Sequence, residues 1–140
     1  MKSLSVVTAI LAFSTSAVAE SPFAGTWKLN RDKAQVDRLE LKIESEGTGI
    51  RYSSRVSAVY AGPLDGSERP GLGSMTKDTF TLKKSGERGF EATQLRSGKP
   101  VSREVVEVSP DGRTLTTSFT LLTPRKDGKQ PTNVFTYKRA

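Results

Sequence analysis

The sequence predicts an all-β fold of about eight antiparallel strands that close into an up-and-down barrel. Three observations support this prediction. Apolar and polar residues alternate along most of the chain, which is the pattern of a strand with one buried face. Short turns rich in Gly, Asp and Ser separate these runs, as expected between antiparallel neighbours. Helical periodicity is nearly absent, and neither an internal repeat nor a second domain is visible.

The first residues of the chain have the composition of a secretory signal peptide. Lys2 supplies a positive charge, residues 4–13 are mostly apolar, and A-V-A at residues 17–19 matches the small-residue cleavage pattern. The apolar run is shorter than the about 20 residues of a membrane-spanning helix. We therefore expect residues 1–19 to be removed. The barrel domain, residues 20–140, is then exported to the periplasm or the cell exterior without a membrane anchor.

The alternation places each strand in order along the chain. The predicted strands span residues 25–29, 38–45, 50–60, 79–84, 90–96, 101–108, 114–122 and 132–138. The polar segment 30–35 is predicted to be a turn or a short helical piece. Residues 61–77 are rich in Gly and Pro and are predicted to be a loop, as is the polar segment 123–131.

Three motifs resemble those of lipocalin-like small secreted bacterial proteins, which have calycin-type barrels. They are G-T-W-K-L-N at residues 25–30, D-G-R-T-L at residues 111–115, and T-N-V at residues 132–134 followed by Tyr137. The resemblance covers both ends of the chain and is poor in the middle. The chain is also shorter than a typical lipocalin and has no evident C-terminal helix.

The resemblance implies a structural role for the only tryptophan, Trp27. In lipocalins this residue lies across the closed end of the barrel, and a basic residue of the last strand packs on its ring. Lys138 and Arg139 occupy the corresponding positions here. Gly25 would let the chain turn tightly into the first strand. A large indole ring fills a barrel end that aliphatic side chains would fill poorly.

The composition excludes several kinds of chemistry. The chain has no His and no Cys, so it lacks the usual general base near neutral pH, the thiol nucleophile and the common zinc ligands. The 15 acidic residues show no diagnostic spacing. S-M-T-K at residues 74–77 matches S-x-x-K, but it lies in a predicted loop rather than at the start of a helix. We expect no enzyme, no catalytic residue, no cofactor and no metal.

The predicted barrel interior is the remaining candidate site. Only 34% of the chain is hydrophobic, which favours a cavity over a filled core, although barrels of this size occur in both forms. Arg103 and Glu104 are consecutive in one predicted strand, so one of the two charges should point inward and need a partner or ligand. The ligand-binding residues predicted from this pattern are Tyr52, Val56, Tyr60, Phe80, Arg103 and Phe119.

Two functions remain after these exclusions. The lipocalin resemblance implies a non-enzymatic exported barrel that binds a small apolar or amphipathic molecule. The alternative is a protein-interaction module, such as a periplasmic inhibitor, that acts through residues 61–77 and 123–131. The net charge of +7 is spread over the chain, and the aromatic residues fall on the apolar faces of the strands, so a nucleic-acid partner is not expected.

Overall fold

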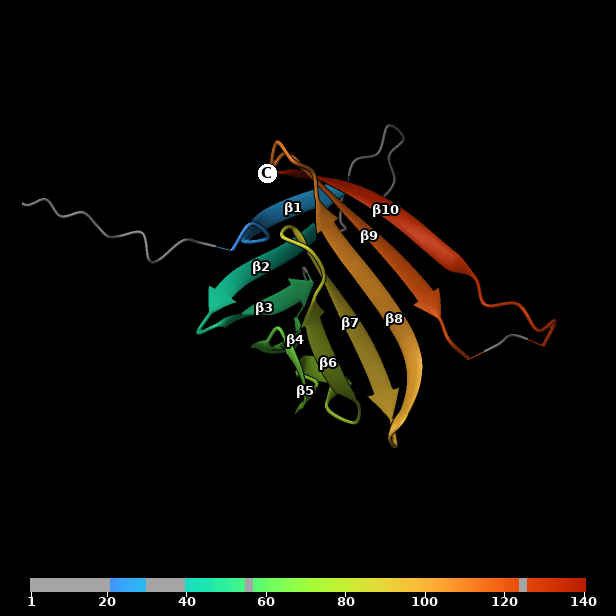
Figure 1. Ribbon diagram of the computed structural model, residues 1–140. Coiled ribbons are helices and arrows are strands. Elements are labelled where there is room, and N and C mark those ends of the chain that lie inside the picture. The colour runs from blue at the N-terminus through green and yellow to red at the C-terminus, as the bar shows by residue number, and fades with distance from the viewer. Residues whose placement is uncertain (1–20, 30–39, 55–56, 124–125) are drawn as a thin grey trace, which may run out of the picture.

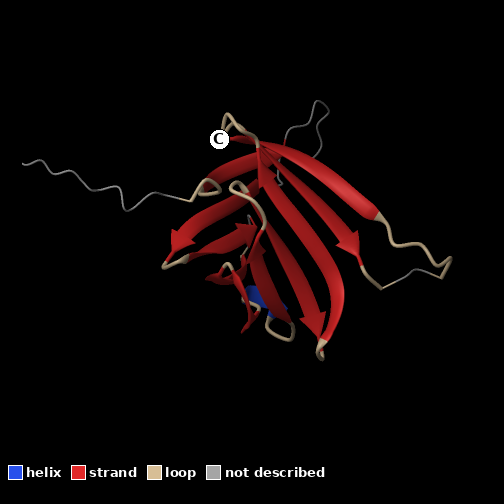
Figure 2. Ribbon diagram, viewed as in Figure 1, coloured by secondary structure: helices blue, strands red, loops and turns tan. Residues whose placement is uncertain are grey.

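The computed structural model describes residues 21–29, 40–54, 57–123 and 126–140, and these residues form ten strands and one short 3-10 helix. The helix covers Gly73–Met75 and interrupts an otherwise all-β structure (Figure 2). The strands are β1 Gly25–Leu29, β2 Glu40–Glu46, β3 Gly49–Ser54, β4 Ala58–Pro63, β5 Asp65–Pro70, β6 Thr79–Lys84, β7 Gly89–Arg96, β8 Lys99–Val108, β9 Thr114–Leu121 and β10 Thr132–Arg139.

The ten strands form one antiparallel sheet that curls into a nearly closed barrel (Figure 1). Neighbours in the chain are neighbours in the sheet from β5 through β10, and again from β1 through β4, while β1 pairs with β10. The outer strands β4 and β5 are consecutive in the chain and lie beside each other. The prediction of an all-β up-and-down barrel is therefore confirmed, with ten strands where about eight were expected.

One extra strand arises because the predicted strand 50–60 is a hairpin. The backbone N–H of Ser54 donates to the carbonyl of Ser57 at 2.9 Å, and β4 runs back along β3. The fold-back sets Tyr52 directly opposite Tyr60. The turn contains neither Gly nor Pro, so the usual sequence signal for a hairpin is missing.

The second extra strand, β5, lies in the segment predicted to be a loop. The expectation that residues 61–77 lack regular structure was wrong, since this segment holds the end of β4, all of β5 and the short helix. The strand is irregular: its register with β6 shifts between Asp65 and Glu68, and Gly66 has a φ of +86°. Bulges, Gly and Pro are tolerated at the edge of a sheet, which explains how this composition supports a strand.

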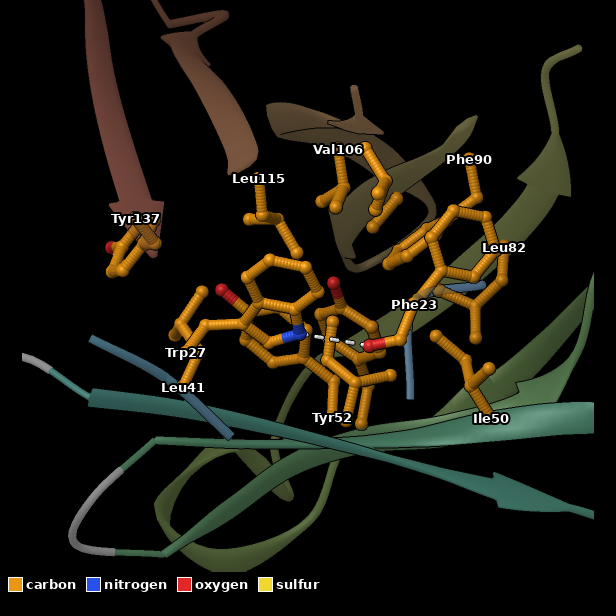
Figure 3. Packing of buried hydrophobic residues seen from close by; sticks show 14 of the residues in the cluster. Phe23, Trp27, Leu41, Ile50, Tyr52, Leu82, Phe90, Val106, Leu115 and Tyr137 are labelled. Carbon is orange, nitrogen blue, oxygen red and sulfur yellow. Dashed lines mark hydrogen bonds between the residues drawn. The ribbon is translucent and has the colours of Figure 1, made fainter. Parts of the chain in front are cut away.

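Trp27 lies in the core and is 0% exposed (Figure 3). Its indole N–H donates to the carbonyl of Phe23 at 2.9 Å, so the one polar atom of the ring is satisfied inside the protein. The ring of Phe23 in turn meets that of Phe90 edge-on, with ring centres 4.9 Å apart. The segment before β1 therefore folds into the barrel and closes this end.

Arg139 lies over the Trp27 ring, with its guanidinium carbon 4.2 Å from the ring centre. The guanidinium donates to three backbone carbonyls, those of Gly112 at 2.7 Å, Ala24 at 2.8 Å and Pro22 at 3.2 Å. It thereby joins the start of the barrel to the turn between β8 and β9 and to the end of the chain.

Gly25 makes this arrangement possible, because it has a φ of +142° and a Cβ there would lie 2.5 Å from a guanidinium nitrogen of Arg139. Its role is to leave room for the cation. Lys138, the other basic residue expected at the closure, is exposed and pairs across the sheet with Lys28 on the opposite face from Trp27. Arg139 alone therefore supplies the cation on the ring.

Trp27→Ala should lower the free energy of unfolding by about 3–5 kcal/mol, because it leaves a large cavity at the closed end. The matched control is Val134→Ala, at a side chain that is 61% exposed, where the change should be within about 0.5 kcal/mol. Both values can be measured by denaturant unfolding followed by circular dichroism. A Trp27→Ala loss as small as that of the control would contradict the packing described here.

Candidate functional site

Glu104 is the charged residue of β8 that points into the barrel. Its ladder partner in β9 is Phe119, and the neighbouring inward pair is Val106 with Thr117, both fully buried. Arg103 was predicted to bind ligand, and the structure places it on the outer face, exposed, with its Nε 3.8 Å from a carboxylate oxygen of Glu91. The buried valines of β8 fix this alternation, so the inward charge is negative rather than positive.

Two tyrosines from the opposite side of the barrel donate hydrogen bonds to this carboxylate. The hydroxyl of Tyr60 lies 3.2 Å from Oε1 of Glu104, and that of Tyr52 lies 3.3 Å from Oε2. The two rings stack on each other, with centres 4.6 Å apart and planes 16° from parallel. The β3–β4 hairpin therefore delivers both hydroxyls to the same group, one to each oxygen.

The space for the carboxylate comes from a small residue beside it. Across the sheet, Glu104 has Ala92 of β7 on one side and Phe119 of β9 on the other. The cross-strand partner of Ala92 in β6 is Leu82, which is fully buried. Tyr137 of β10 lies close enough that the charge of Glu104 contributes to raising the pKa of its phenol, although burial contributes more.

Burial determines the titration of this cluster. Desolvation raises the pKa of Glu104 above its ordinary value, and the hydrogen bonds from Tyr60 and Tyr52 offset part of that shift because they favour the charged form. Desolvation and the neighbouring negative charge both raise the pKa of each of these two tyrosines well above its ordinary value. The hydroxyls therefore keep their protons and act as donors to the carboxylate.

The charge of Glu104 has no cationic partner within the described part of the chain. The whole chain contains 22 Lys and Arg residues, yet the ion pairs that the structure describes all involve other carboxylates. The arginines closest in sequence make other contacts: Arg103 with Glu91, and Arg96 with Asp78. A desolvated carboxylate with two hydrogen bonds and no counter-charge is energetically costly in a folded protein.

Partly accessible apolar side chains lie near Glu104 on the inner face of β9 and β10. Phe119 is half-buried, Leu121 is 36% exposed and Phe135 is 38% exposed. All three share the inward face, because their ladder partners are Glu104, the buried Ser102 and the buried Thr117 respectively. The inner face of β9 and β10 thus has accessible apolar side chains on both sides of the Glu104–Phe119 pair, with Leu121 farther from Trp27 and Phe135 nearer to it.

A second polar cluster fixes the strands beside this accessible wall. Asp78, which is buried, accepts two hydrogen bonds of 3.0 Å from Arg96 and one from Gln94. Gln94 accepts a bond of 2.8 Å from the hydroxyl of Ser102. The bonds from Arg96 are the main reason why the pKa of Asp78 is lowered. Since every member has a partner within the cluster, its role is to hold β6, β7 and β8 together.

The structure brings most of the predicted ligand-binding residues together. Tyr52, Tyr60, Phe80 and Phe119 point inward, and the rings of Tyr60 and Phe80 lie 5.0 Å apart. Val56 lies outside the described residues, as do residues 1–19 and the turn predicted at 30–35. Sequence reasoning missed Tyr137 as a neighbour of Glu104, although alternation with Arg139 in β10 could have placed it inward.

Comparison with known proteins adds no assignment to this geometry. No protein-family model matches the chain, and no curated protein has a significantly similar sequence. Over the residues that the structure describes, no three His, Cys, Asp or Glu side chains gather as a metal site. In the same part of the chain, no helix has the length and apolar character to span a membrane.

The raised pKa of Glu104 predicts how stability depends on pH. Below the pKa of this group in the unfolded chain the carboxyl is neutral in both states, and its burial carries no charge penalty. As pH rises through the higher pKa of the folded state, the buried group ionises and the free energy of unfolding falls. Glu104→Gln should remove this component, so the variant should gain stability relative to wild type as pH rises from the ordinary pKa of glutamate through the raised pKa of the folded state.

Glu107→Gln is the matched control, because Glu107 is exposed on the outer face of the same strand. It removes the same formal charge and should leave the pH dependence of wild type in place. Denaturant unfolding at several pH values measures all three proteins. If the free energy of unfolding varies with pH in the same way in wild type and Glu104→Gln, Glu104 is not desolvated in the folded protein.

Proposed function

We propose that this protein is a non-enzymatic exported barrel that binds one small amphipathic molecule in its interior. The observation that carries this proposal is the position of Glu104. Its neighbours include fully buried core residues and the accessible apolar side chains of Phe119, Leu121 and Phe135 on the inner face of β9 and β10. An amphipathic ligand needs this combination of an apolar surface and one polar group that fixes its orientation.

A solid structural core would gain nothing from this carboxylate. A leucine or methionine at position 104 would fill similar volume without a desolvation cost, and buried charges without counter-charges are rare for this reason. The partly exposed aromatic rings beside it also have unused contact surface. Both features are explained if a bound molecule completes the interior. The resemblance of the two chain ends to lipocalin-like secreted proteins supports the same class of function.

Export is the second component of the proposal, and the sequence supports it. Residues 1–19 have the charge, apolar run and cleavage pattern of a signal peptide. A protein outside the cytoplasm would meet its ligand in the periplasm or the surrounding medium. The proposed cellular role is therefore capture or carriage of a molecule from that compartment.

The β9–β10 hairpin favours a second candidate, the protein-interaction module. Val134 is 61% exposed on the outer face of β10, close to the polar segment 123–131. Residues 61–77 contribute less to this alternative than the sequence suggested, because β5 and the short helix order much of that segment. A barrel whose interior binds nothing would make this hairpin the better candidate for the functional surface.

Phe119→Ala tests the interior directly, with Phe90→Ala as its matched control. Phe90 is 0% exposed, so its truncation should cost about 3–5 kcal/mol of unfolding free energy. Phe119 is only half-buried and loses fewer contacts, so its truncation should cost about 1–2 kcal/mol. Titration with an environment-sensitive apolar dye should show one saturable site in wild type. Phe119→Ala should change the dye affinity by about threefold or more.

The two variants together separate binding from stability. The proposal expects Phe90→Ala to affect stability strongly while the folded fraction keeps the dye affinity of wild type. The opposite pattern contradicts it: no saturable dye binding in wild type, together with equal stability losses for Phe119→Ala and Phe90→Ala. The barrel would then be solid, and the hairpin alternative would take precedence.

A further inference from the structure

We infer that the ligand carries an organic ammonium group, which the Glu104 carboxylate binds beside Tyr52, Tyr60 and Tyr137, while an apolar body lies along Phe119, Leu121 and Phe135. This inference rests on the proposed function and specifies its ligand class. Hydrogen-bonding capacity, charge and shape of the site each favour this ligand class.

The Glu104 carboxylate offers hydrogen-bond acceptors, and the two tyrosines bound to it have committed their donors. A carboxylate can accept about four hydrogen bonds, and Glu104 receives one on each oxygen. Tyr52 and Tyr60 each direct their only hydroxyl proton to that carboxylate. The unused capacity therefore consists of lone pairs on Glu104 and on the tyrosine oxygens. An ammonium group, with up to three N–H donors and no acceptor, is the complementary partner.

Charge distinguishes an ammonium group from other ligand groups that could donate a hydrogen bond to Glu104. A neutral alcohol could donate one hydrogen bond to Glu104, but it would leave the desolvated negative charge without compensation. An anionic ligand such as a fatty acid would be repelled by the same charge, and the ion pairs of the nearby Arg103 and Arg96 are with Glu91 and Asp78. A cation satisfies both the hydrogen-bonding and the charge requirement, and charge-assisted bonds are stronger than neutral ones.

The surroundings of Glu104 define the shape of the rest of the ligand. Across the sheet, Glu104 has the small Ala92 on the side of β7 and the aromatic residue Phe119 on the side of β9. Two further inward side chains are partly accessible: Leu121, one pair farther from Trp27 than Phe119, and Phe135, whose partner Thr117 lies one pair nearer to it. A headgroup at Glu104 thus has accessible apolar surface beside it on β9 and β10. This geometry fits an amine on an alkyl or aromatic chain.

The test compares three probes of equal length: decylamine, decanol and decanoate. Each displaces an environment-sensitive dye from wild-type protein at pH 7.5. Decylamine should bind about ten- to a hundredfold more tightly than decanol, the range expected when one charge-assisted hydrogen bond is added, and decanoate should bind most weakly. Decylamine affinity should fall as pH drops through the pKa of Glu104, because the carboxylate is neutralised while the alkylammonium stays charged.

Two variants test whether Glu104 causes the preference for decylamine over decanol. Glu104→Gln keeps the shape of the side chain without its charge, so the preference for decylamine over decanol should fall about tenfold or more. Glu107→Gln should keep the wild-type preference. If Glu104→Gln does not fold, the ranking of the three probes on wild type and its pH dependence decide the matter.

The outcomes distinguish this inference from the proposed function. Saturable decanol binding without a preference for decylamine, or a preference that survives in Glu104→Gln, would overturn the ammonium assignment and leave an interior binding site in place. Tighter binding of decanoate would also overturn it, since the interior would then be effectively cationic. No saturable binding of any of the three probes would overturn both.

Discussion

The alternation of side chains along β8 is the constraint on which the rest of the structure depends. Val106 and Val108 must face inward to complete the core beside Leu115, and the period of two then brings Glu104 inward as well. A shift by one residue would bury Arg103 and expose both valines. The alternation that buries the valines therefore also places the Glu104 carboxylate in the barrel interior. The hydroxyls of Tyr52 and Tyr60 stabilise its charge by hydrogen bonds.

The two ends of the barrel have different physical properties because of how the chain closes. At one end Trp27, Phe23 and the guanidinium of Arg139 fill the space and tie three backbone segments together. At the other, the inner wall of β9 and β10 keeps partly exposed aromatic and aliphatic side chains. Rigidity at the closed end fixes the positions of β1 and β10, and with them the inner wall to which a ligand would bind.

Much of this architecture follows from local sequence patterns. Period-two alternation identified the barrel and most strand positions, since each strand has one wet and one buried face. Pairing of an aromatic ring with a terminal cation was anticipated from Trp27 and the last two basic residues. The identity of that cation depends on which face of β10 each residue occupies, and Arg139 is the residue on the inward face.

The remaining features depend on contacts between residues far apart in the chain. The hairpin of β3 and β4 and the strand β5 have no distinctive local signal, because the sequence that joins β3 to β4 contains neither Gly nor Pro, whereas the edge strand β5 contains one of each. Whether Arg103 or Glu104 points inward depends on which alternate residues of β8 face the core, and only the packing of its valines determines this. The tyrosine–carboxylate cluster joins residues 44 and 52 positions apart.

The central claim is that the Glu104 carboxylate inside the barrel is desolvated and binds the ammonium group of a ligand. Carbon-13 NMR of the Glu104 side-chain carboxyl, titrated with and without saturating decylamine, tests it most directly. The account predicts that the pKa of Glu104 is above the ordinary range of glutamate in the free protein and falls when the amine is bound, because a nearby positive charge favours the ionised form. A pKa of Glu104 that is ordinary in the free protein, or that does not change at saturation with the amine, would contradict it.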